Sequence, residues 1–143
     1  PNMVLMAPKD ENELQHMLKT AVEYPGPAAV RYPRGKGEGV LLDEELCTIN
    51  IGEAKELKTG KDAAILAIGN MVSPSLKAAL ELEREGINTS VINARFIKPL
   101  DKEMILRIAK ETGHILTVEE NMLQGGFGSA VSPEGGSRVE YIL

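Results

Sequence analysis

The sequence predicts an α/β protein: a three-layer α/β/α domain with a mostly parallel sheet, preceded by a strand–helix–strand unit. Short apolar runs alternate with amphipathic segments of about a dozen residues, which indicates βαβ units with right-handed crossovers. The run 63–69 is apolar throughout, as expected for a central strand that is buried on both faces. The glycine-rich stretch 35–39 separates the two parts and predicts domains over residues 1–43 and 44–143.

Residues 1–43 are expected to form a strand, a helix and a second strand. The first strand is the short apolar run 3–7, and the second covers 28–32. Asp10 and Glu13 form a variant of the capping box, which places the start of the helix there. Helical spacing predicts one buried apolar face for this helix: Leu14, Met17, Leu18, Ala21 and Val22. Such a unit cannot cover both faces of its two strands, so it is expected to be the incomplete end of a larger domain.

The second part is expected to continue the alternation. Its strands are predicted over 49–57, 63–69, 89–97, 115–118 and 139–143. Ser73-Pro74 supplies an N-cap and a proline at the first helical position for a helix that ends at Gly86. Asp101 caps the next helix, which ends at Gly113. The expected apolar face of that helix consists of Met104, Ile105, Ile108 and Ala109.

Composition and charge narrow the class of protein. Of the 143 residues, 43% are hydrophobic and 26% are charged, which is typical of a soluble globular chain. The net charge of -5 and the aromatic content of 3% give no reason to expect nucleic acid or an anionic membrane as a partner. The single cysteine, Cys47, rules out an internal disulfide, and nothing near it in the sequence would activate it. We expect His16 to pack or to face solvent, and His114 to mark the start of a strand.

The stretch Ala29-Val30-Arg31-Tyr32-Pro33-Arg34-Gly35 is the candidate binding segment. Two guanidinium groups three residues apart lie on an apolar strand that ends in proline and glycine. A guanidinium binds phosphate or carboxylate at two points, and a strand end would hold it rigidly. Chemistry alone leaves two interpretations open: an anion clamp formed by Arg31 and Arg34, or two surface arginines in ordinary ion pairs.

A second glycine-rich stretch, Gly125-Gly126-Phe127-Gly128-Ser129, follows a predicted strand and is expected to open a helix. Glycines there would let a phosphate approach the backbone, but the third glycine of the dinucleotide-binding fingerprint is missing. We therefore interpret the stretch as a tight strand-to-helix turn. Glu119 and Glu120 end the strand on opposite faces, so we expect a structural role, such as a hydrogen bond to this turn, instead of acid–base chemistry. Arg95 and Lys98 are interpreted as solvated or interface charges.

Four stretches carry a resemblance to a known family: 1–14, 29–35, 93–101, and 118–121 with 125–129. Together they closely resemble the 1-deoxy-D-xylulose 5-phosphate synthases, a family of transketolase-like thiamine-diphosphate enzymes. The resemblance covers about residues 1–131. Transketolase and the β subunits of 2-oxo acid dehydrogenases share the turn before Asp101 and the glycine-rich motif, but they are less similar around Arg31 to Gly35.

The resemblance implies a transferase with three domains that depends on thiamine diphosphate and Mg²⁺. Such an enzyme is a cytoplasmic homodimer, or plastidic in a plant, and joins pyruvate to glyceraldehyde 3-phosphate with release of carbon dioxide. Its product leads to isoprenoids, thiamine and pyridoxal. Residues 1–43 would be the end of its pyrimidine-binding domain, and residues 44–143 its transketolase-type C-terminal domain.

The resemblance also implies roles for single residues. In the family, an arginine that matches Arg34 binds the phosphate of the aldehyde. Arg31 is a weaker match, which implies support of either the fold or the phosphate site. The cofactor, metal and catalytic motifs of the family match no residue here. The chain is therefore expected to be a carboxyl-terminal fragment that is inactive alone and binds neither cofactor nor metal.

The resemblance ends after Val131. Members of the family continue into a helix, and here Ser132 to Ser137 is expected to replace that helix. Two other interpretations of the whole chain stay open. One is a non-catalytic interaction module that supports dimerisation, and the other is a fragment of transketolase or of a 2-oxo acid dehydrogenase β subunit.

Overall fold

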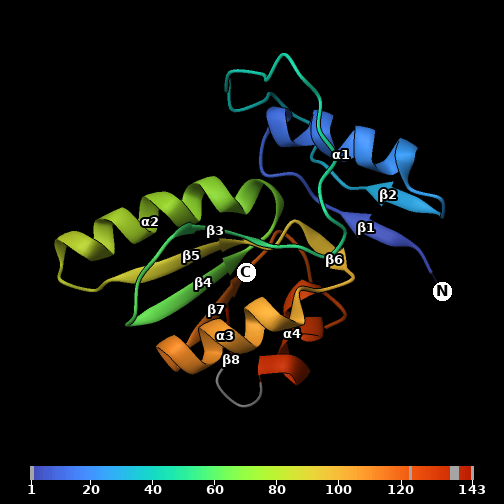
Figure 1. The fold of residues 1–143 in the computed structure, drawn as a ribbon. Helices are drawn as coiled ribbons and strands as arrows, with labels where there is room; N and C mark the ends of the chain where they lie inside the picture. The colour runs from blue at the N-terminus through green and yellow to red at the C-terminus, as the bar shows by residue number, and fades with distance from the viewer. Residues whose placement is uncertain (1, 123, 136–138, 143) are drawn as a thin grey trace.

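The computed structural model describes residues 2–122, 124–135 and 139–142, which form an α/β structure with two sheets (Figure 1). The elements follow in the order β1 (Val4–Met6), α1 (Glu11–Glu23), β2 (Ala28–Val30), β3 (Lys55–Lys58), β4 (Ala63–Ala67), the 3₁₀ turn η1 (Gly69–Met71), α2 (Val72–Arg84), β5 (Thr89–Asn93), β6 (Phe96–Lys98), α3 (Lys102–Thr112), β7 (Ile115–Val118), α4 (Phe127–Gly135) and β8 (Val139–Ile142).

The larger sheet has the strand order β3-β5-β4-β7-β8. Its strands pair in parallel except for β3, which runs antiparallel to β5 at one edge. Helix α2 covers one face, and α3 and α4 cover the other (Figure 1). This arrangement confirms the predicted three-layer domain with a mostly parallel sheet.

Alternate residues of the central strand β4 pack into two hydrophobic cores, one on each face of the larger sheet. Ile65 and Ala67 pack with Val72 and Ala79 of α2. Ala64 and Leu66 point the other way, into a core that also includes the buried apolar faces of α3 and α4: Ile105, Ile108, Phe127 and Val131. Because successive side chains of a strand point to opposite faces, a continuously apolar run is what a strand between two helical layers requires.

The smaller sheet joins the two predicted parts of the chain. Its order is β2-β1-β6, with β2 parallel and β6 antiparallel to β1. The single strand predicted over 89–97 is therefore wrong, because the chain turns at Arg95, which has a φ of 59°. The turn sends Phe96 into a different core, where it is fully buried with Met6 and Met17.

The glycine-rich stretch 35–39, which was predicted to separate the two parts, lies along α1. It is the start of a longer segment that follows this helix, residues 35–53, which is called the strap below. Glu11 accepts hydrogen bonds from the backbone amides of Glu38, Gly39 and Val40. Further along, the amide of Ile49 donates to Thr20 Oγ1 at 2.8 Å. These bonds hold the strap against α1 before the chain enters the larger sheet.

The ends of α1 and α3 follow the predicted caps. Asp10 accepts from the amide of Glu13 at 2.7 Å, and Asp101 accepts from the amide of Met104 at 2.9 Å. Gly113 ends α3 in the left-handed region, with a φ of 76°. Local hydrogen bonding decides such ends, so sequence patterns predict them well.

Other local predictions need correction. Helix α2 begins at Val72 with Met71 as its N-cap, because the turn η1 leads directly into it, so Ser73 lies inside the helix. The predicted strand 49–57 is reduced to β3, since the strap bonds to α1 up to Ile49. On α1, Leu18 and Val22 are 49% and 85% exposed, because the small sheet covers only the side with Met17.

The segment after Val131 also differs from the prediction. Helix α4 continues to Gly135, so 132–135 extend a helix and do not replace one. Phe127 and Val131 are buried against α3 and the sheet, which stabilises the helix although its sequence is rich in glycine and serine. The rest of that predicted replacement, 136 and 137, lies outside the described residues.

Candidate functional site

The candidate site lies where strands of both sheets end. A pocket of about 120 Å³, called the Arg31 pocket below, is lined by Ala7, Arg31, Tyr32, Pro33, Gly69, Asn70 and Glu120. These residues follow the carboxyl ends of β1, β2, β4 and β7. Ligand sites in α/β proteins typically form at such strand ends, because loops converge there.

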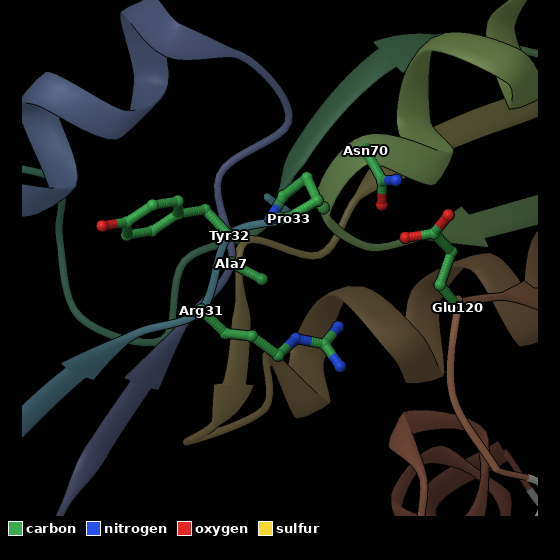
Figure 2. Close-up of a pocket in the computed structure, with 7 residues that line it drawn as sticks. Ala7, Arg31, Tyr32, Pro33, Asn70 and Glu120 are labelled. Carbon is green, nitrogen blue, oxygen red and sulfur yellow. The ribbon is translucent and has the colours of Figure 1, made fainter. Parts of the chain in front are cut away.

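Three polar side chains face the space of the Arg31 pocket. Figure 2 shows the guanidinium of Arg31, the amide of Asn70 and the carboxylate of Glu120 pointing toward one another, while the ring of Tyr32 points away. The backbone amide of Arg31 donates to Met6 O at 2.8 Å, which extends the β1–β2 pairing and holds Arg31 in place. The pocket therefore offers both a cation and an anion.

A neighbouring cleft of about 410 Å³, called the Arg34 cleft below, is larger. Its lining includes Lys9, Leu14 and the segment from Tyr32 to Glu38. Two of its acids are engaged by the protein: Asp10 pairs with Lys9 and caps α1, and Glu11 binds the strap amides.

Hydrogen bonds keep Glu11 ionised. Its own backbone amide contributes most to lowering the pKa of Glu11, and the amides of Gly39, Glu38 and Val40 lower it further. Arg34 and Lys36, by contrast, have no ion pair with any residue in the described part of the chain. The cleft thus presents two exposed cationic groups that an anion could bind.

The structure does not bring the two predicted arginines into one pocket. Arg31 lines the Arg31 pocket and Arg34 lines the Arg34 cleft, with Tyr32, Pro33 and Asn70 common to both. In an extended chain, residues an odd number of positions apart project to opposite sides. A single clamp with both guanidinium groups is therefore not the geometry observed.

The glycine-rich turn before α4 is structural, as the sequence indicated. Glu119 is buried and accepts from the amides of Phe127 at 2.9 Å and Gly128 at 2.8 Å. A Cβ at Gly126 would lie 2.2 Å from Met122 O and 2.6 Å from Glu119 Oε1, so only glycine fits. The carboxylate of Glu119 thus occupies the amide donors that a phosphate would need.

Glu120 and Asn70 were not singled out in the sequence as binding residues. Both directly follow ends of strands in the parallel sheet, Glu120 within two residues of β7 and Asn70 in η1 after β4. That position was the available signal, but which polar residues share a pocket depends on how the two sheets are placed relative to each other.

Arg95 lies at the junction of the two parts, as an interface charge. Its Nε donates to Glu13 Oε1 at 2.9 Å, and Asn93 Nδ2 lies 2.9 Å from each oxygen of the same carboxylate. Glu13 is 4% exposed, so this network is a buried tie between α1 and the turn from β5 to β6. Lys98 is exposed, in agreement with a solvated charge.

Among the described residues, no group of three or more histidine, cysteine, aspartate or glutamate side chains is arranged to hold a metal ion. The described helices also lack the length and apolar character that crossing a membrane requires.

The fold is an α/β/α domain with a mostly parallel sheet and polar residues at the strand ends. Sequence comparison shows to which family of such domains the chain belongs. The chain belongs to the family described as transketolase, C-terminal domain, whose sequence profile matches residues 52–137.

Individual relatives narrow the similarity further. The chain is 63% identical over 131 residues to a 1-deoxy-D-xylulose-5-phosphate synthase of Heliobacterium modesticaldum, covering 92% of this chain and 20% of the relative. It is also 63% identical over 131 residues to 1-deoxy-D-xylulose-5-phosphate synthase 1 of Geobacter sulfurreducens, covering 92% of this chain and 21% of the relative. The chain thus spans about a fifth of the length of these relatives.

A solved structure supports the fold over nearly the whole chain. It is described as a split gene transketolase, an inactive β4 tetramer, and is 34% identical to this chain with a TM-score of 0.80. The match covers 94% of this chain and 44% of that one. The similarity therefore includes the strand–helix–strand unit as well as the larger sheet.

Proposed function

We propose that this chain is part of a thiamine-diphosphate-dependent transferase that joins pyruvate to glyceraldehyde 3-phosphate and releases carbon dioxide. The product, 1-deoxy-D-xylulose 5-phosphate, leads to isoprenoids, thiamine and pyridoxal, and the enzyme acts in the cytoplasm. The observation that carries this proposal is the 63% identity over 92% of the chain to synthases of that name. The segment Arg31 to Gly35 favours this reaction over those of transketolase or a 2-oxo acid dehydrogenase.

In this proposal, thiamine diphosphate and Mg²⁺ are bound by residues outside this chain. The described residues do not fit these groups, because Glu119 fills the amide donors of the glycine-rich turn and the described acids form no metal cluster. The chain itself is expected to release no carbon dioxide from pyruvate and glyceraldehyde 3-phosphate. We assign residues 1–43 to the end of the pyrimidine-binding domain and 44–143 to the C-terminal domain.

Arg34 is the residue we propose for binding the phosphate of the aldehyde. Its guanidinium has no partner among the described residues and lines the larger cleft, whose volume of about 410 Å³ suits a small ligand. Lys36 lines the same cleft and adds a second positive charge. Arg31 supports the site less directly, because the carboxylate of Glu120 faces the same pocket and disfavours a second anion there.

Kinetics of an intact enzyme that carries this chain would test the assignment. Arg34→Ala is expected to raise KM for glyceraldehyde 3-phosphate by roughly 30- to 1,000-fold, or about 2–4 kcal/mol, and to leave KM for pyruvate nearly unchanged. Arg84→Ala is the matched control, since Arg84 is an exposed arginine at the end of α2. Equal increases in both KM values would refute the role of Arg34 in phosphate binding.

A second candidate function is an interaction module that supports a homodimer. The observation that favours it is an apolar groove beside α1 whose lining includes Leu18, Val22 and Leu46, all exposed. Sedimentation velocity over a wide concentration range distinguishes this candidate. A strict monomer at every concentration would count against it.

A further inference from the structure

The strap brings a cysteine, a histidine and an aspartate together at a distance from the candidate site. Cys47 Sγ lies 3.4 Å from His16 Nδ1, and His16 Nε2 lies 2.9 Å from Asp43 Oδ2. Asp43 and Cys47 belong to the strap, whereas His16 belongs to α1. None of the three lines the Arg31 pocket or the Arg34 cleft.

The hydrogen bonds determine which nitrogen of His16 carries the proton. The backbone amide of Cys47 donates to His16 Nδ1 at 3.1 Å, and an amide N–H can only donate, so Nδ1 is the acceptor. In the neutral ring the proton is therefore on Nε2 and is donated to the carboxylate of Asp43. The unprotonated nitrogen then faces the thiol, as a general base must.

Hydrogen bonds favour the ionised form of the Asp43 carboxylate, which is the form that accepts the hydrogen bond of His16 Nε2. The side-chain amide of Asn12, followed by His16, lowers the pKa of Asp43 below its ordinary value. The backbone amide of Asp43 in turn donates to Asn12 Oδ1 at 2.8 Å, so the side chain of Asn12 holds both the backbone and the carboxylate of Asp43. His16 has 8% of its side chain exposed, while Cys47 is exposed and open to a small reagent.

We propose that Cys47 is a reactive thiol that exchanges with small organic disulfides, with His16 as its base and Asp43 as the residue that positions His16. Cys47 Sγ forms a bond to one sulfur of the disulfide, and the original S–S bond breaks. The thiol proton passes to His16 Nδ1 and then to the departing thiolate, which leaves as a free thiol. Cys47 is thereby oxidised to a mixed disulfide, and the reagent is reduced.

The fold allows this proton transfer. When Nδ1 takes the proton, the amide of Cys47 loses its acceptor, and because the strap is exposed there, water can replace it. The resulting imidazolium stays paired with Asp43. The three residues thus combine a nucleophile, a base and an orienting acid, as in a catalytic triad. They are assigned no part in the transferase reaction.

The rate of exchange with neutral 4,4′-dithiodipyridine, measured on the whole 143-residue chain, tests this proposal. Every labelling event reports Cys47, because the chain has one cysteine. We expect the folded chain to react at least about tenfold faster than the same chain unfolded in urea. A folded chain that reacts no faster than the unfolded one would overturn the proposal.

Variants separate the base from the positioning residue. We expect His16→Gln to reduce the folded rate to that of the unfolded chain, and Asp43→Asn to reduce it several-fold. Glu44→Gln is the control, because it removes a neighbouring exposed carboxylate and should change the rate less than about twofold. An unchanged rate in Asp43→Asn, which replaces a residue exposed on the surface, would contradict the role of Asp43 even if the His16 variant fails to fold.

Nitrogen-15 NMR of the imidazole ring gives a readout that a merely structural role would not move. The proposal requires the Nε2–H tautomer of His16 in the folded chain and a smaller population of it in Asp43→Asn. A ring protonated on Nδ1 in the unmodified chain would also overturn the proposal.

Discussion

Replacing Glu13 by alanine removes the carboxylate that ties α1 to the turn between β5 and β6. That carboxylate accepts from the backbone amide of Lys9, from Asn93 Nδ2 and from Arg95 Nε, each at 2.9 Å. The side chains of Glu13 and Arg95 are 5% and 16% exposed. Water can therefore reach the guanidinium only in part once the carboxylate is gone.

The size of the loss follows from this burial. Removing one partner of a buried ion pair costs about 3–5 kcal/mol, because the other charge stays buried without compensation. Glu13→Ala should therefore lower the free energy of unfolding by about 3–5 kcal/mol. Glu13→Gln keeps one acceptor oxygen and a similar volume, so we expect a smaller loss of about 1–3 kcal/mol.

Urea unfolding followed by far-ultraviolet circular dichroism measures these losses. Glu23→Ala is the control on the same helix, where an exposed pair with Lys19 at 3.7 Å is worth about 0.5 kcal/mol or less. In a double-mutant cycle, Glu13→Ala and Arg95→Ala together should cost less than the sum of the single losses, with a coupling of about 0.5–3 kcal/mol. A loss below about 1 kcal/mol for Glu13→Ala, or strict additivity, would refute the reasoning.

Two further predictions concern the turn before α4 and the strap. Gly126→Ala should destabilise the chain by about 1–3 kcal/mol in urea unfolding, since its Cβ would collide with Met122 O, whereas Gly35→Ala, with nothing within 4 Å, should change little. Equal stabilities of these two variants would argue against the tight turn. The pKa of Glu11 is lowered from 4.5 in the folded state, so its contribution to stability is present above that value and is lost as pH falls through the lower folded pKa. Urea unfolding midpoints of Glu11→Gln and of the unmodified chain should therefore be compared from pH 7 downward. The midpoint of the variant should be the lower one at pH 7 and should approach that of the unmodified chain in acid. A difference that stays constant with pH would contradict this.

Patterns that depend on near neighbours were readable from the sequence. The caps at Asp10 and Asp101 and the left-handed end at Gly113 are decided within one turn of helix. The continuous apolar run before Gly69 similarly indicated a strand between two helical layers. The hydrogen bonds that the amides of the glycine-rich turn donate to Glu119 were also predictable, because strand alternation separates Glu119 from Glu120.

Contacts between distant segments could not be read in this way. Helical spacing placed Leu18 and Val22 on the face of Met17, but only the packing of the small sheet showed that the buried stripe is narrower. Likewise, nothing in the local sequence indicated that β6 would leave the larger sheet, or that the strap would bring Cys47 and Asp43 to His16.

The sequence by itself thus determined the α/β class, most of the element types and several helix ends, because these depend on periodicity and on hydrogen bonds between near neighbours. The tertiary structure alone decided that Arg31 and Arg34 line different pockets, that Glu120 and Asn70 face Arg31, and that Glu13 binds Arg95. The physical reason is that a pattern specifies which face of an element is apolar or polar, whereas the partner of that face depends on how separate elements pack.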